Sequence, residues 1–430
     1  MESPQEMRSI SWTATGGRAG FSRKMNSKMG FVIMTICLEL PPALAYTYGM
    51  KNFTSDELKN IYAARRQKLF DFMAENKVTA AIFEDTEGRR DPAVRYFTGH
   101  PSDALWICSA EGKSVLVPWD ENLAAERAVD VKVIPYNKYN RKNTEAVREV
   151  LKSFKKKGPR IKAEISPATP YPLFLQYVDA LDNWDVLCRE HSVHDFVVEM
   201  RACKDEYEIE CTKEAARVGD LIIGKIEQGI DDGSIKTETD VSLLIERELR
   251  LNGCERNGFD TLAAGPSRSF AIHAFPGYTS APWPAKGLSI LDFGVVFEGY
   301  TSDTTLTVVK DATPEQKKLV ELVEKAAHDA LPYYKPGEQI RMAGLVADEI
   351  FEKANRTMPH TLGHGIGLEI HEFPRVSAKQ KEELVFKPGM IVTLEPGLYD
   401  PELGGVRLEN DVLITESGNE VLTHSKIIYR

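Results

Sequence analysis

The feature that most constrains this chain is a pair of predicted hairpins that bring acidic residues face to face. Residues 289–309 contain two apolar, β-branched runs separated only by Phe297-Glu298. Two residues suffice for a tight turn between antiparallel strands, so this stretch predicts a hairpin. With those two residues as the turn, the register sets Asp292 opposite Asp303.

The second hairpin lies further along the chain and repeats this arrangement. Residues 391–399 and 406–415 are apolar runs separated by a stretch rich in turn-forming residues. A hairpin centred on Glu402 sets Glu395 opposite Glu409. Directly opposed side chains have Cβ atoms roughly 4.5–5.5 Å apart, and like charges at that spacing destabilise a sheet. We therefore expect cations between the acids.

Divalent metal ions explain these acids better than solvated sheet faces do. Asp292 lies in an apolar stretch, residues 290–294, where a solvated carboxylate is not expected. Bridging carboxylates can hold two metal ions about 3.5–4 Å apart. Oxygen ligands favour Mg, Mn or a similar ion, and an added imidazole shifts the preference toward Mn, Fe, Co or Zn.

Three of the chain's nine histidines, His360, His364 and His371, lie close together in the sequence. His364 is the candidate ligand, because three neighbouring glycines would let the backbone approach a bound group without a Cβ in the way. His273 precedes the first acid pair, Asp292 and Asp303. Together with the acids, these histidines predict a metal centre.

The chain has 430 residues, a length that predicts two domains. In residues 51–190, strands alternate with helices, which predicts an α/β domain with a mixed sheet. Residues 191–201 are interpreted as a connection, and residues 195–430 as an α+β domain. The expected strands in the first domain are 79–83, 104–110, 114–118, 131–136, 161–165 and 186–188. The main expected helices are 143–157, 171–182, 205–230, 237–251, 313–333 and 340–355.

Residues 1–50 differ from the rest and are interpreted as a leader or an upstream extension. A basic part precedes the apolar run 30–38, as in a secretory signal, and the run is too short to span a membrane. The alternative is translation from an upstream start. We expect a cytoplasmic protein, or an exported or organellar one if this segment is a targeting signal.

Composition excludes some classes of partner. Lys+Arg 54 against Asp+Glu 64 gives a net charge of −10, so a nucleic-acid partner is not expected. No membrane partner is expected either. The six cysteines form no CxxC pair, which favours free thiols over a disulfide scaffold or a zinc site.

Four stretches resemble the pita-bread metallopeptidases, in particular the prolidase and aminopeptidase P branch. They are LDFGVVFEGYTSDTTLT (291–307), HTLGHGIGLEIHEFP (360–374), VTLEPGLY (392–399) and VRLENDVLIT (406–415). The resemblance implies a creatinase-like α/β N-terminal domain over residues 51–190. It implies an α+β pita-bread catalytic domain over residues 195–430.

The resemblance also implies a role for each site residue. Asp292 would chelate the first of two divalent metals, Asp303 and Glu409 would bridge both, and His364 and Glu395 would complete the second. The catalytic residues would be His273, His371 and Glu395, with Glu395 as the favoured proton shuttle. The substrate-binding residues would be His273, His360, His371, Tyr399 and Arg407. Manganese is the expected metal, and Co, Fe or Zn would satisfy the same ligands.

The implied activity is hydrolysis of the bond between an N-terminal residue and proline, in a homodimer that takes a proline-containing peptide. Three alternatives stay open. A methionine aminopeptidase is one, although the extra α/β domain counts against it. The others are a lyase acting on a non-peptide substrate at the same site, and a binding module that keeps the metal for stability.

The chain departs from the family pattern at one position. Relatives commonly have Thr-Arg-Thr where this chain has Thr305-Leu306-Thr307. The arginine is not a ligand, so activity is not excluded. We expect the change to affect subunit contacts or the outer part of the site.

Overall fold

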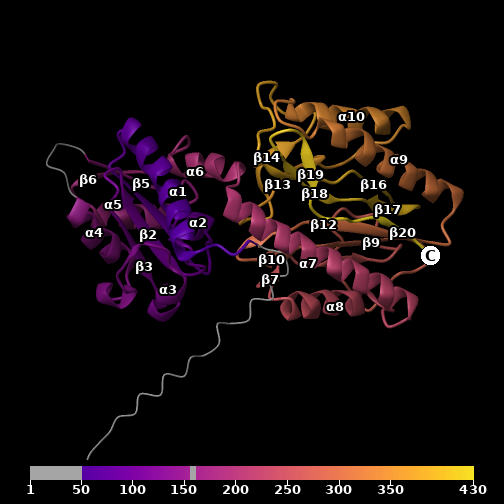
Figure 1. Cartoon of the computed structure of the whole chain (residues 1–430), viewed down its shortest axis with the longest axis horizontal. Coiled ribbons are helices and arrows are strands. Elements are labelled where there is room, and N and C mark those ends of the chain that lie inside the picture. The colour runs from indigo at the N-terminus through magenta and orange to yellow at the C-terminus, as the bar shows by residue number, and fades with distance from the viewer. Residues whose placement is uncertain (1–50, 155–160) are drawn as a thin grey trace, which may run out of the picture. The chain divides into compact units, whose positions relative to one another are not determined.

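The computed structural model describes residues 51–154 and 161–430, and all of these belong to one compact unit (Figure 1). The expected leader, residues 1–50, lies outside the described residues. Within the part that the structure describes, no helix is both long enough and apolar enough to cross a membrane.

The first part of the described chain is a six-stranded mixed sheet, as predicted. Its strand order is β4-β3-β2-β1-β5-β6; β2 pairs antiparallel with both β1 and β3, and the remaining pairs are parallel. The strands are β1 (Ala80–Asp85), β2 (Ala104–Ser109), β3 (Ser114–Pro118), β4 (Lys132–Val133), β5 (Ile161–Ile165) and β6 (Trp184–Leu187). The helices are α1 (Ser55–Glu75), α2 (Pro92–Thr98), α3 (Glu121–Arg127), α4 (Asn143–Phe154) and α5 (Tyr171–Ala180).

The stretch that the sequence presented as a connection is largely helical. Helix α6 (Val193–Ala202) begins with a capping box at Ser192, whose hydroxyl accepts from the backbone N–H of Asp195. Two long helices follow it, α7 (Glu206–Asp231) and α8 (Glu238–Leu251), close to their predicted limits. The segment from α6 to α7 therefore joins the two parts of the chain as ordered structure.

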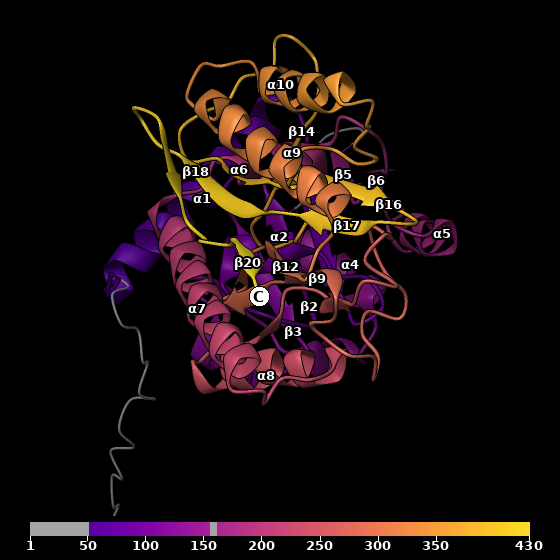
Figure 2. The ribbon, with the colours of Figure 1, turned by 90° about the vertical axis from the view of Figure 1, so that its right-hand side faces the viewer.

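The second part of the chain is built of β-sheets with helices packed against them (Figure 2). Ile222 of α7 and Ile245 of α8 share one apolar cluster with Leu291 of β9. Helices α9 (Pro314–Ala330) and α10 (Ile340–Lys353) pack against Val392 and Val412 in another cluster. The strands are β7 (Arg256–Asn257), β8 (Leu262–Ala264), β9 (Gly287–Phe293), β10 (Val295–Phe297), β11 (Tyr300–Thr301), β12 (Thr304–Lys310), β13 (Gly363–Gly365), β14 (Glu372–Val376), β15 (Ile391–Leu394), β16 (Gly397–Asp400), β17 (Gly404–Arg407), β18 (Asn410–Ile414), β19 (Asn419–Val421) and β20 (Ile427–Tyr429).

The turn of the first hairpin differs from the prediction. Phe297 pairs with Tyr300, so the turn consists of Glu298 and Gly299 instead of Phe297 and Glu298. Both turn residues have positive φ, 46° and 87°. A two-residue hairpin turn of this kind requires positive φ at both positions, and a glycine supplies it without strain. This requirement decides the position of the turn.

The shifted turn also corrects the predicted pairing of the first two acids. Asp292 lies opposite Thr305, not opposite Asp303. Asp303 lies in the break between β11 and β12. The two carboxylates therefore do not form a directly opposed pair.

The second hairpin has the predicted register. Leu394 pairs with Asn410, and beyond a break Gly397 pairs with Arg407. Both pairs belong to the register centred on Glu402. Glu395 and Glu409 lie in the break between these ladders, where the backbone N–H of Glu395 donates to the carbonyl of Leu362 and that of Glu409 donates to the carbonyl of Thr305.

The described cysteines are free, as the sequence predicted. Burial raises the pKa of the thiols of Cys108, Cys211 and Cys254. These cysteines therefore remain protonated, and they pack as small apolar side chains.

Candidate metal centre and substrate cavity

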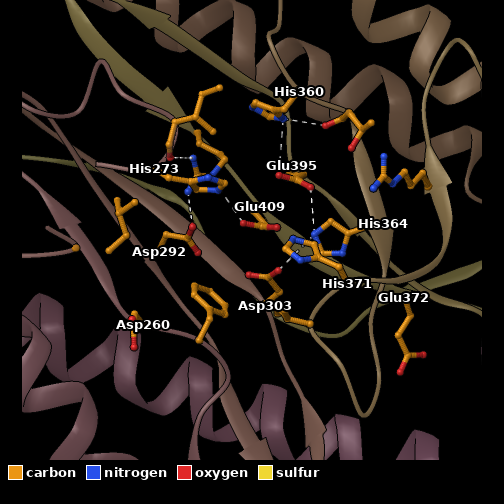
Figure 3. A pocket seen from close by; sticks show the side chains of 18 of the residues that line it. Asp260, His273, Asp292, Asp303, His360, His364, His371, Glu372, Glu395 and Glu409 are labelled. Carbon is orange, nitrogen blue, oxygen red and sulfur yellow. Dashed lines mark hydrogen bonds and ion pairs between the residues drawn. The ribbon is translucent and has the colours of Figure 1, made fainter. Parts of the chain in front are cut away.

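A cavity of about 910 Å³ collects nearly all the residues that the sequence singled out (Figure 3). Of the predicted site residues, those in its wall are His273, Asp292, Asp303, His360, His364, His371, Glu395, Arg407 and Glu409. Only Tyr399 is not among the lining residues. Its hydroxyl lies 3.1 Å from His360 Nε2 and accepts a 2.7 Å hydrogen bond from Arg407 Nη1.

Three of the five predicted ligands form a compact group. Asp303, His364 and Glu409 each offer a ligand atom, and these atoms all lie within 4.8 Å of one another. Glu395 joins the edge of the group, since its Oε1 lies 3.4 Å from His364 Nε2. His364 Nε2 also lies 3.7 Å from Asp303 Oδ2. One imidazole thus faces two carboxylates, as in a site that could hold a divalent cation.

The glycines around His364 have a different role from the one predicted. A Cβ on Gly363 would lie 2.0 Å from the carbonyl oxygen of Thr393, and one on Gly365 would lie 2.4 Å from that of Phe373. These glycines therefore make room for neighbouring protein segments, not for a bound group. The close packing places β13 between β14 and β15, which puts His364 beside the carboxylates of the neighbouring segments.

Burial and mutual repulsion control the charge of these acids. Burial, and then the charges of Glu409 and Asp292, raises the pKa of Asp303 well above its usual value. Burial and the charge of Asp292 raise the pKa of Glu409 to about 7. Burial and the charge of Glu409 also raise the pKa of Glu395. Such raised pKa values mean that nearby positive charges do not fully offset the negative charge of the ionised carboxylates. A bound cation would supply the missing positive charge.

Burial acts in the opposite direction on the histidines. It lowers the pKa of His364 to about 4, with a further contribution from His371. The ring centroids of these two histidines lie 4.4 Å apart. His364 is therefore neutral at physiological pH, which is the form that binds a metal.

Asp292 is oriented by the buried Arg407. Arg407 Nη2 donates to Asp292 Oδ2, and Arg407 Nε donates to Thr305 Oγ1 at 2.9 Å. The other carboxylate oxygen, Asp292 Oδ1, is buried and has no hydrogen-bond partner among the described residues. An unpaired buried carboxylate oxygen in an acid-lined cavity is chemically suited to a cation.

Sequence reasoning missed the residues that hold the acids in place. Thr305 Oγ1 donates to Glu409 Oε2 at 2.6 Å. The backbone N–H of Asp303 donates to Asp411 Oδ2 at 3.0 Å. Thr393 Oγ1 donates to Glu395 Oε1 at 3.3 Å and accepts from the backbone N–H of His364 at 3.1 Å. The signal in the sequence is period-two alternation, because Thr305, Asp411 and Thr393 each lie two residues from an acid.

A buried ion-pair cluster is formed by Glu372, the residue that follows His371 in the chain. Glu372 accepts from Arg201 Nη2 of α6, and its Oε2 lies 3.2 Å from Lys204 Nζ. The side chains of Glu372 and Lys204 are 4% and 1% exposed. This cluster ties the segment from α6 to α7 to the strand that follows His371. Sequence reasoning missed it, because residues 201 and 372 are 171 positions apart.

The cavity wall contains further residues that the sequence analysis did not single out. They include Phe259, Asp260, Leu262, Phe275, Arg375 and Gln380. Phe275 is 97% exposed. These residues belong to the substrate space around the acids.

Leu306 does not lie where the sequence analysis expected it. It is fully buried and packs in the apolar cluster that contains Leu291, Phe293 and Val308. The position is part of the core beneath α7 and α8, not part of the outer site. The leucine thus contributes apolar packing behind the strand that follows Asp303.

Comparison with known proteins identifies both parts of the chain. Residues 65–200 match the Creatinase/Prolidase N-terminal domain, and residues 210–416 match Metallopeptidase family M24. Together with the acid-lined cavity, these matches define a metallopeptidase with a creatinase-type N-terminal domain and a pita-bread catalytic domain.

The relatives agree with this class. The Xaa-Pro dipeptidase of Pyrococcus horikoshii is 31% identical over 366 residues, which cover 84% of this chain and 97% of that protein. The crystal structure of the prolidase from Pyrococcus horikoshii OT3 has a TM-score of 0.72 at 27% identity, over 84% of this chain and 98% of that one. The X-Pro aminopeptidase from Thermotoga maritima MSB8 has a TM-score of 0.72 at 25% identity, over 85% and 100%. The chain belongs to metallopeptidase family M24.

Proposed function

We propose that this protein is a dinuclear-metal Xaa-Pro peptidase, which hydrolyses the bond between an N-terminal residue and proline. The observation that carries the proposal is the convergence of four carboxylates and one imidazole on a single cavity: Asp292, Asp303, His364, Glu395 and Glu409. The relatives named Xaa-Pro dipeptidase and prolidase support the choice of substrate.

The residues present fit two divalent cations. Asp292 Oδ1 is buried and has no hydrogen-bond partner within residues 51–154 and 161–430, and three of the acids have pKa values raised by burial and mutual repulsion. Asp292, Asp303 and Glu409 would hold one ion; Asp303, Glu409, His364 and Glu395 would hold the other. One nitrogen among many oxygens suits Mn, with Co, Fe or Zn as alternatives. When bound, such ions supply Lewis acidity for hydrolysis.

The side chains around the centre can move protons at defined atoms. Glu395 is buried with a raised pKa, so its carboxylate can accept a proton from the attacking water and later release it. His371 lies on the cavity wall beside His364. We assign to it donation to the developing oxyanion or to the leaving imino nitrogen. His273 lines the same space and would steady the tetrahedral intermediate.

Substrate recognition would rest on the shape of the proline ring and on the peptide carbonyl, because a bond to proline has no N–H to donate. His360, Tyr399 and Arg407 form one connected network at the cavity. We assign substrate positioning to this network.

A length series of peptides tests the proposal. Metal-depleted protein is reloaded with Mn, Co, Fe or Zn and assayed with Ala-Pro, Ala-Pro-Ala and Met-Ala. Hydrolysis of the prolyl peptides but not of Met-Ala supports a Xaa-Pro peptidase, and the preferred length then separates a dipeptidase from an aminopeptidase. Hydrolysis of Met-Ala alone would favour a methionine aminopeptidase. Hydrolysis of none would favour a lyase or a binding module.

Two further parts of the proposal concern the whole protein. We propose a homodimer in the cytoplasm, and domain limits of 51–190 and 195–430. Sedimentation velocity would measure the assembly, and cell fractionation would measure the location. Limited proteolysis would test the domain limits.

A further inference from the structure

One carboxylate in the cavity is not engaged by the protein. Six acidic side chains line the cavity, and five of them interact with other residues of the chain. Their partners are Arg407 for Asp292, His364 for Asp303, Arg201 and Lys204 for Glu372, His364 and Thr393 for Glu395, and Thr305 for Glu409. Among the described residues, Asp260 has no hydrogen-bond or ion-pair partner.

The backbone places Asp260 along the end of β9 that carries Asp292. Two residues after it, Leu262 pairs with Asp292 and also lines the cavity. Two residues before it, the N–H of Gly258 donates to the carbonyl of Gly294 at 2.8 Å. Asp260 is therefore held between an attachment to β9 at Asp292 and one to Gly294 just beyond that strand, and its exposed side chain lies in the cavity wall.

Asp260 is also set apart from the predicted metal ligands other than Asp292. Figure 3 shows it to one side of the cavity, away from the group of Asp303, His364, Glu395 and Glu409. It is not a member of the compact group whose ligand atoms lie within 4.8 Å of one another. Its charge is thus available to a substrate when the metal ligands are occupied.

The substrate class supplies a matching cation. A peptide with a free N-terminus carries an α-ammonium group whose pKa is roughly 8, so it is charged at neutral pH. A carboxylate without a protein partner can accept strong, charge-assisted hydrogen bonds from such a group. A blocked N-terminus or an internal Xaa-Pro bond offers no such charge.

We propose that Asp260 receives the α-ammonium group of the substrate's N-terminal residue and so restricts the enzyme to free N-termini. The inference deepens the proposed function and rests on it. Asp260 acts in binding: the ammonium group is anchored at Asp260, and the scissile bond is then directed toward the acids and His371.

The test compares wild type with Asp260→Asn, which keeps the size of the side chain and removes its charge. The assay is steady-state hydrolysis of Ala-Pro by metal-loaded protein. We expect KM to rise about tenfold or more, as for loss of a charge-assisted hydrogen bond, while kcat falls less than about threefold. Asp182→Asn removes the same charge at an exposed position of the N-terminal part and should leave KM unchanged.

A second measurement separates recognition of the ammonium group from a general change in cavity shape. Propanoyl-proline matches Ala-Pro but lacks the α-amino group, and its inhibition constant is measured for both proteins. We expect the same constant for wild type and Asp260→Asn. An unchanged KM for Ala-Pro in the variant would overturn the inference, as would an inhibition constant that rises as much as KM. If wild type hydrolyses no Xaa-Pro peptide, it is the proposed function that fails.

Discussion

Arg407 donates to one carboxylate oxygen of Asp292, while the other, Oδ1, is buried and has no hydrogen-bond partner in the part of the chain that the structure describes. The guanidinium is 2% exposed and also donates to Thr305 and to Tyr399. One arginine thus fixes the direction of an acid, the position of a threonine that holds Glu409, and a tyrosine at the substrate cavity. We propose that this arrangement presents the second oxygen of Asp292 to the candidate metal centre.

Replacing Arg407 with methionine should therefore damage both the fold and metal binding. Removing one partner of a buried ion pair typically costs about 3–5 kcal/mol. We expect a loss of this size in the free energy of unfolding of the metal-free protein, measured with urea. Arg148→Met changes an arginine whose side chain is 47% exposed and should have an effect below about 0.5 kcal/mol. Equal stability of the two variants would contradict the role of Arg407.

Thr305→Val should weaken metal binding more than it weakens the fold. The Thr305 hydroxyl holds Glu409 at 2.6 Å, and loss of a group that orients a ligand typically lowers metal affinity by about 10–100-fold. Titration with Mn measures this affinity. Thr239→Val on α8 is the control, because that hydroxyl donates to the backbone carbonyl of Thr279 at 2.8 Å and contacts none of the acids or Arg407 among the described residues. Similar affinities in both variants would show that the hydroxyl of Thr305 does not position Glu409.

The stability of the metal-free protein should depend on pH through Glu409. Its folded pKa of about 7 lies above its unfolded value, so the folded state binds the proton more tightly. The stabilisation from this proton is complete below the unfolded pKa, roughly 4.3, and is lost as the pH rises toward 7. Buried histidines such as His364 titrate with the opposite sign and are common to wild type and Glu409→Gln. The difference between the two proteins therefore reports Glu409 together with Asp303 and Glu395, whose pKa values its charge raises.

We expect wild type to lose stability relative to Glu409→Gln by a few kcal/mol (roughly 3) between pH 4.5 and 7.5, since one pKa unit is about 1.4 kcal/mol. Urea unfolding at a series of pH values measures it. Saturating Mn should remove the difference in pH dependence of the free energy of unfolding between the two proteins, because a bound cation favours the ionised form of Glu409. A pH-independent difference in the metal-free proteins would contradict the burial of an uncompensated carboxylate at this position.

Leu306→Arg, which restores the residue common among relatives, should destabilise this chain. Leu306 is fully buried among Leu291, Phe293 and Val308, where an arginine would bring an unpaired charge into the core. We expect the thermal midpoint to fall by more than about 10 °C, or the protein to be insoluble. Leu243→Arg, at a position 59% exposed on α8, is the control and should express normally. An unchanged midpoint for Leu306→Arg would mean that the site accommodates a charge.

Much of the fold could be predicted because local signals agreed with the final structure. The alternating strands and helices of residues 51–190 do form a mixed sheet, and the turn-rich stretch around Glu402 does centre its hairpin. The register of the first hairpin could not be predicted from apolar alternation alone. There the turn forms at Glu298 and Gly299, the two residues with positive φ, and Asp292 therefore pairs with Thr305 instead of Asp303.

The candidate site, like the fold, could be predicted only in part from the sequence. Acids in apolar strands identified the residues that line the cavity, because an unpaired carboxylate in a strand core needs a compensating charge. The supporting contacts were not predictable: Asp303 meets Asp411 across 108 positions, and Arg201 meets Glu372 across 171. Such contacts depend on how separate sheets and helices pack, which local patterns do not encode. The roles of the individual ligands and the domain limits stay predictions.

The most direct test of the account is metal content measured together with activity in Asp303→Ala, since Asp303 lies in the compact group with His364 and Glu409. Elemental analysis gives metal ions per chain, and Ala-Pro hydrolysis is followed on the same samples. We expect two divalent ions per chain and prolyl hydrolysis for wild type, and loss of both for a folded Asp303→Ala. Full hydrolysis by Asp303→Ala would contradict the metal centre on which the proposed function rests.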